Sequence, residues 1–156
     1  MDIDLAKLKF TFQAKPLLIG GKAMEYYGLR MSGNDIDFVI IAADYQRLSQ
    51  AYPDHLKDLW GDLGVCVFEF EIWQSICLFD YEFLSAGALD QGEYLVISLE
   101  KLLFLKALAM MKSEKYHRDL EMIVQKFLDD RYSTWWAELP EERRQFYLAK
   151  KQSLPA

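Results

Sequence analysis

The sequence predicts an α+β protein in which a mixed β-sheet with flanking helices precedes a C-terminal helical segment. Short apolar runs alternate with amphipathic segments through the first part of the chain, which is typical of strands and helices that share one core. A glycine pair, Gly20 and Gly21, separates one apolar run from a helical pattern. From Ser98 onward the pattern is helical only. We therefore expect an α+β core over residues 1–97 and a helical segment packed on it over residues 98–156.

The elements of the core are predicted from the period of their apolar residues. Spacings of three and four residues favour helices, and compact runs rich in β-branched and aromatic residues favour strands. Gln74 and Ser75 separate two such runs, which predicts a hairpin at this point. In chain order the expected elements are a helix over 2–13, strands over 16–19 and 36–41 on either side of a helix over 22–27, a helix over 43–59, strands over 65–73 and 76–84, and a strand over 93–97.

The C-terminal segment carries recognisable helix starts. Ser98 suits an N-cap, because its hydroxyl can accept a hydrogen bond from a backbone N–H in the first turn. The helix that it opens is expected to reach about residue 112, and a second helix should follow over 117–128. Pro140 suits a first helical position, so a third helix should run to about residue 151.

Composition excludes several classes of protein. With 156 residues, 52% of them hydrophobic, the chain can bury a real core, and disorder is not expected. The net charge of −6 argues against a general polyanion-binding protein. No apolar run is long enough to span a bilayer, and Asp2 and Asp4 stand where a signal peptide would be positively charged. Cys66 and Cys77 lie in apolar runs, so we expect buried reduced thiols and a cytoplasmic protein.

The most informative pattern is a carboxylate pair downstream of the glycine pair. Asp35 and Asp37 alternate with Ile36 in an expected strand, so their side chains should project from the same face. Two carboxylates on one face repel each other unless a cation lies between them. The N–H groups of the turn at Gly20 and Gly21 can receive phosphate oxygens, and the carboxylates can hold hard cations. The pattern predicts a site for a Mg²⁺-bound nucleoside triphosphate.

Further side chains are candidates for the same site. Four cationic or polar residues are placed to contact the triphosphate: Lys22, Arg30, Ser32 and Lys106. Metal-dependent transfer of a nucleotide group from such a triphosphate usually also uses a third carboxylate, which completes a second metal site. Asp80 is the first choice, because it lies mid-strand between Phe79 and Tyr81, in a run of apolar residues where an unpaired charge is costly. Glu82, Glu71 and then Glu69 are the alternatives.

These residues resemble the signature of the nucleotidyltransferase superfamily with the DNA polymerase β-like fold. The signature is an apolar residue with two small residues, here Ile19, Gly20 and Gly21, followed by a helix and the pattern Asp-apolar-Asp at 35–37. The helical tail resembles that of the small prokaryotic branch, which includes abortive-infection-type toxins. Three positions of the tail match it: Lys106, Lys115 and Asp119. The resemblance covers roughly residues 15–125.

The resemblance implies a Mg²⁺-dependent transfer of a nucleoside monophosphate from an NTP to an acceptor hydroxyl. Asp35, Asp37 and Asp80 would hold two Mg²⁺ ions, and the acceptor could belong to a protein, an RNA or a small molecule. The alternative is a catalytically silent nucleotide-binding or interaction module, such as one half of a toxin–antitoxin pair. The macromolecular partner would then be an antitoxin or a second copy of the chain.

Overall fold

A mixed seven-stranded sheet forms the centre of the protein in a computed structural model that describes residues 3–111, 113 and 116–152. Its strand order is β3-β4-β5-β2-β1-β9-β8, and a separate two-stranded sheet joins β6 to β7. The strands are β1 (Leu17–Leu18), β2 (Ile36–Val39), β3 (Leu56–Leu59), β4 (Asp62–Val67), β5 (Phe70–Trp73), β6 (Ser75–Ile76), β7 (Phe79–Asp80), β8 (Leu89–Asp90) and β9 (Leu95–Val96). The predicted α+β class is confirmed.

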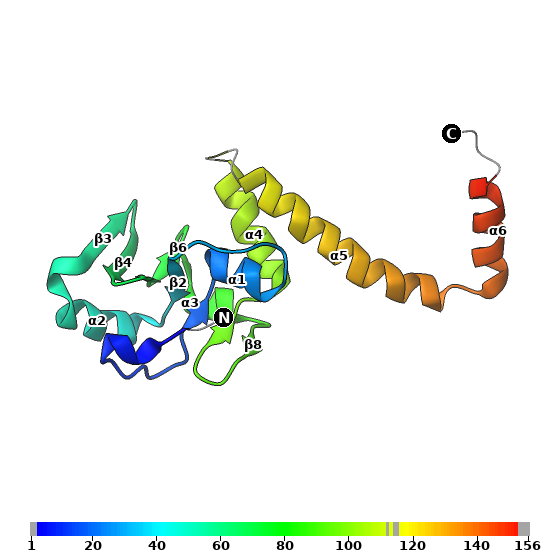
Figure 1. Ribbon diagram of the computed structural model, residues 1–156. Helices are drawn as coiled ribbons and strands as arrows, with labels where there is room; N and C mark the ends of the chain where they lie inside the picture. The colour runs from blue at the N-terminus through cyan, green and yellow to red at the C-terminus, as the bar shows by residue number, and fades with distance from the viewer. Residues whose placement is uncertain (1–2, 112, 114–115, 153–156) are drawn as a thin grey trace.

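Helices α1 and α2 pack on this sheet, whereas most of α5 and all of α6 extend away from it (Figure 1). The helical elements are η1 (Leu5–Leu8), α1 (Gly20–Tyr26), α2 (Ala42–Ala51), η2 (Pro53–His55), α3 (Tyr81–Ser85), α4 (Leu99–Met110), α5 (His117–Glu138) and α6 (Glu141–Gln152). Helix α1 packs against β2, α2 against β4, and α4 against the start of α5. Figure 1 shows the rest of α5 extending away from the sheet, with α6 at its far end.

The order of the strands is set by two parallel pairings at the middle of the sheet. Strand β1 pairs with β2 in the antiparallel sense and with β9 in the parallel sense. Strand β2 in turn pairs in parallel with β5, so that Asp37 lies opposite Glu71. The fully buried side chains of Phe38 and Phe70 anchor this region of the core. The neighbouring carboxylates of β2 and β5 therefore sit on a rigid part of the sheet.

Several helices begin and end where the sequence indicated. The Ser98 hydroxyl accepts a hydrogen bond from the backbone N–H of Lys101 at 3.2 Å, so the predicted N-cap of α4 is confirmed. Helix α6 follows Pro140 as expected. Helix α5 is longer than predicted, because its pattern continues ten residues beyond Leu128. Of the expected helical segment, α4 and the first part of α5 pack on the core, whereas α6 buries none of its residues.

The predicted helices 2–13 and 43–59 are both wrong in extent. The first is only η1, and the chain then turns through Lys9 at φ 44°. Beyond it the backbone N–H groups of Gln13 and Ala14 donate to the buried carboxylate of Asp44. Helix α2 ends before Pro53, because a residue that precedes proline avoids the helical conformation, and residues 56–59 form strand β3 instead.

The predicted hairpin is also displaced. The chain reverses at Phe68, which has φ 55°, so the run 65–73 contains parts of two antiparallel strands rather than one strand. The run 76–84 is not a continuous strand either, because it divides into β6, β7 and the helix α3. Strand β8 was not predicted. Cys66 is half-buried and Cys77 is exposed, so the expectation of two buried thiols is wrong for Cys77.

Among the described helices, none is both long and apolar enough to cross a membrane.

Candidate active site

The turn between β1 and α1 brings the backbone against one carboxylate of β2. Gly20 has φ +65°, a conformation that favours glycine, and a Cβ at this position would lie 2.1 Å from Oδ2 of Asp37. The backbone N–H of Gly21 donates a hydrogen bond to the same carboxylate. The first glycine therefore makes room for Asp37, and the second binds it. The N–H of Gly21 already has this carboxylate as its acceptor, which the sequence did not indicate.

Three carboxylates surround the end of β2. Asp37 and Glu71 are direct neighbours across the parallel β2–β5 pair, and Asp35 precedes β2 by one residue. Burial raises the pKa of Asp37 to about 6, and the negative charges of Glu71 and then Asp35 act in the same direction, against the opposing charge of Lys106. The surroundings of Asp37 disfavour its charged form, and a cation bound beside it would reverse this effect.

These carboxylates face a cavity of about 670 Å³ that α4 and α5 close on the opposite side. The glycine turn, Asp35, Asp37 and Glu71 line one wall. The other wall is lined by Leu102, Leu105, Lys106, Tyr116, Arg118 and Asp119, and Arg30 also contributes. Acidic side chains thus line the cavity beside β2 and β5, and three cationic side chains also line it: Lys106 of α4, Arg118 of α5 and Arg30 of the loop after α1. Divalent cations and the phosphates of a nucleotide are ligands that such opposite walls could hold.

Asp119 holds two of these cations in place. Its carboxylate accepts hydrogen bonds from Nε of Arg30 at 2.6 Å and from Nη2 at 2.8 Å, and Nζ of Lys106 lies 2.7 Å from Oδ2. Asp119 and Lys106 are both buried. Although burial opposes it, hydrogen bonds from Arg30 and Lys106 lower the pKa of Asp119 to about 2. One buried anion therefore positions two cations at the cavity, one from α4 and one from the loop after α1.

Lys22 and Ser32, both predicted phosphate contacts, have another partner. Nζ of Lys22 lies 3.2 Å from Oε2 of Glu25, and the hydroxyl of Ser32 donates to the same carboxylate. These hydrogen bonds lower the pKa of Glu25. Neither residue lines the cavity. The structure therefore brings Lys106 and Arg30 to the cavity but leaves Lys22 and Ser32 in a cluster outside it.

The structure does not bring Asp80 to the other carboxylates. Asp80 lies at the end of β7 and is the N-cap of α3, where its carboxylate accepts a hydrogen bond from the backbone N–H of Phe83 at 2.9 Å. It is exposed, so the expectation of a carboxylate held mid-strand in an apolar run is wrong. Of the alternatives, Glu82 is exposed on α3 and Glu69 pairs with Lys7. Only Glu71 among the four candidates lines the cavity.

Sequence reasoning underrated Glu71 and gave Asp119 no structural role. The position of Glu71 depends on the parallel pairing of β5 with β2, and no local sequence pattern predicts that pairing. Its other neighbour is Lys57, whose Nζ lies 3.8 Å from Oε1. The available signal for Asp119 was its place on the first turn of a helix close to several basic residues. Lys115, the remaining family position, lies outside the described residues.

The resemblance to nucleotidyltransferases implies a divalent metal, and the donor atoms at the cavity are of the type that such a metal binds. Three carboxylates next to a cavity offer the hard oxygen ligands that Mg²⁺ prefers. Burial, and after it the neighbouring carboxylates, raise the pKa of Asp37, and a bound cation would lower it. Within the described part of the chain, no three Asp, Glu, His or Cys side chains already form a group that could hold a metal ion. Exposed Asp35 would therefore have to turn toward Asp37 when a cation binds.

The chain matches no protein-family model, and comparison with curated proteins and with solved structures gives no significant match.

Proposed function

We propose that this protein is a Mg²⁺-dependent nucleotidyltransferase that moves a nucleoside monophosphate from an NTP to an acceptor hydroxyl. One observation carries the proposal. Asp37 and Glu71 lie side by side on parallel strands, against a glycine turn, and face a cavity with a cationic wall. Such a cavity suits a metal-bound triphosphate. The acidic side chains would bind the metal, and the metal and the cationic side chains would together neutralise the negative phosphate oxygens.

Each wall has a distinct task in this reaction. Asp35, Asp37 and Glu71 would hold Mg²⁺, with Glu71 as the third carboxylate. Bound there, Mg²⁺ would neutralise the leaving pyrophosphate and lower the pKa of the acceptor hydroxyl. Lys106 and Arg30 would orient the phosphates in line with the attacking oxygen, since Asp119 limits their freedom before the substrate arrives.

A phosphate could bind Lys106 without leaving a buried charge unpaired, because Asp119 is already a counter-ion of this lysine. Lys106 keeps its counter-ion when the cavity is empty of nucleotide, so the free protein tolerates a buried ammonium group. When nucleotide binds, Lys106 gains a second anionic partner. This arrangement would let a cation stay buried between α4 and α5 and still contact a phosphate.

The test uses NTPs labelled at the α-phosphate, each mixed with Mg²⁺, the purified protein and cell extract as a source of acceptor. Wild-type protein should transfer label to an acceptor, and Asp37→Asn and Glu71→Gln should lower the rate by about a thousandfold, equivalent to roughly 4 kcal/mol of transition-state stabilisation. Asp80→Asn is the matched control, because asparagine also caps helices, and it should keep the wild-type rate.

Two outcomes contradict the proposal. If Glu71→Gln transfers label normally while Asp80→Asn is inactive, the assignment of the third carboxylate is wrong. If every NTP binds but none is transferred by wild-type protein, the cavity belongs to a nucleotide-binding module without catalysis.

A further inference from the structure

A row of large side chains along α5 and at its C-cap residue, Leu139, is exposed in the part of the chain that the structure describes. Val124, Leu128, Tyr132, Trp135 and Leu139 are all exposed, with 53–57% of Leu128, Tyr132 and Trp135 open to solvent. We call these five residues the α5 stripe. They follow one another at steps of four, four, three and four residues, so they share one side of the helix. A soluble helix that projects from its core would ordinarily be polar on every side.

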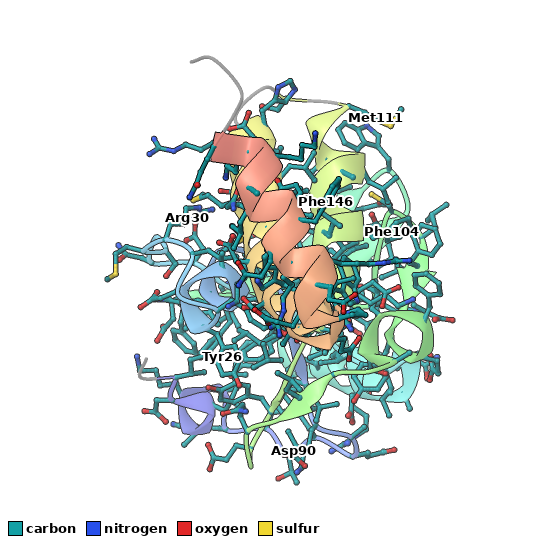
Figure 2. All side chains as sticks on the ribbon, turned by 90° about the vertical axis from the view of Figure 1, so that its right-hand side faces the viewer. Tyr26, Arg30, Asp90, Phe104, Met111 and Phe146 are labelled. Carbon is teal, nitrogen blue, oxygen red and sulfur yellow. The ribbon has the colours of Figure 1, made fainter. Side chains whose placement is uncertain are left out.

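Helix α6 adds to this exposed surface. Figure 2 views the molecule from the end of α5 and shows α6 in front of the core, with Phe146 labelled on it. Phe146, Tyr147 and Leu148 are exposed, and the ring of Tyr147 contacts Trp136 at a centroid distance of 5.5 Å. With the α5 stripe, these side chains expose on the order of 800 Å², which is about what one partner contributes to a standard protein–protein interface.

We propose that a second copy of this chain covers the α5 stripe, with the two α5 helices antiparallel about a two-fold axis near Tyr132. The spacing of the stripe is nearly the same in both directions along the helix. In an antiparallel pair, Val124 of each copy therefore lies opposite Leu139 of the other, and Leu128 lies opposite Trp135. A two-fold interface requires this self-complementarity, whereas an unrelated partner does not.

The first test is the mass of the purified full chain by light scattering during size-exclusion chromatography, from about 1 to 100 µM. Wild-type protein should give twice the chain mass of 18.3 kDa. Leu128→Glu with Trp135→Glu should give the monomer mass, and because both side chains are exposed, the melting curve should still be cooperative. Ser133→Lys is a matched control on a different side of α5 and should stay dimeric.

The second test distinguishes the antiparallel arrangement from any other pairing. In a Cys77→Ser background, Val124→Cys with Leu139→Cys should form an intermolecular disulfide under mild oxidation. Each single variant should not, because identical positions lie about 22 Å apart in an antiparallel pair of ideal helices. A monomeric wild-type protein at every concentration would overturn the proposal, and so would single variants that cross-link as well as the double variant. Neither result bears on nucleotidyl transfer.

Discussion

The raised pKa of Asp37 makes the stability of the protein depend on pH in a defined direction. A free aspartate has a pKa of about 3.9, whereas burial and the neighbouring carboxylates raise the pKa of Asp37 to about 6. Between about pH 4 and 6 the folded protein holds a proton that the unfolded chain has lost. The free energy of unfolding therefore decreases as pH rises through this window, and at neutral pH the charged Asp37 costs about 3 kcal/mol.

The Asp37→Asn variant removes this cost while keeping an oxygen that can accept the Gly21 hydrogen bond. At pH 7.5 it should be more stable than wild type by about 2–3 kcal/mol, which corresponds to a melting temperature about 5–10 °C higher for a chain of this size. Near pH 4 the difference should vanish, because Asp37 is then protonated in the folded wild-type protein. Thermal melts followed by circular dichroism from pH 4 to 7.5 measure both limits.

Two further measurements make the comparison specific. Asp80→Asn changes an exposed carboxylate and should follow the wild-type pH dependence. Mg²⁺ at millimolar concentration should raise the melting temperature of wild type at pH 7.5, since a cation relieves the repulsion, and should have little effect on Asp37→Asn. A stability difference that is constant across the pH range, or an Asp37→Asn variant that melts below wild type at pH 7.5, would refute the electrostatic reasoning.

The remaining predictions concern the turn and the cationic wall. Gly20→Ala should lower the free energy of unfolding in urea by at least about 2 kcal/mol more than Gly28→Ala. Both glycines have similar positive φ, but only a Cβ at residue 20 would meet a carboxylate, so equal losses would exclude this clash. Lys106→Met should remove most of the Mg²⁺–NTP shift in melting temperature whereas Lys22→Met should preserve it, and the reverse would return the phosphate site to the start of α1. Asp119→Asn should lower stability by about 3 kcal/mol at neutral pH and by much less near pH 2, where the wild-type carboxylate also becomes protonated; a loss that does not depend on pH would argue against the ion pairs.

Local chemistry in the sequence was enough to predict the part of the fold that is built from neighbouring residues. Ser98 caps α4 because its own hydroxyl reaches a backbone N–H three residues later. The order of strand, glycine turn, helix and strand from β1 to β2 was predicted for the same reason. The break at Pro53 was also readable in principle, although the apolar spacing across it favoured a longer helix.

Only the tertiary structure decided which distant residues share the cavity. Glu71, and not Asp80, lies beside Asp37 at the cavity because β5 pairs in parallel with β2, a contact between segments more than 30 residues apart in the chain. Asp119 binds both Lys106 and Arg30, the latter 89 residues earlier in the chain, for the same kind of reason. A carboxylate in an exposed cap and one beside a cavity look alike in the sequence, since their difference lies in burial and in neighbouring charge, and both are set by packing between elements.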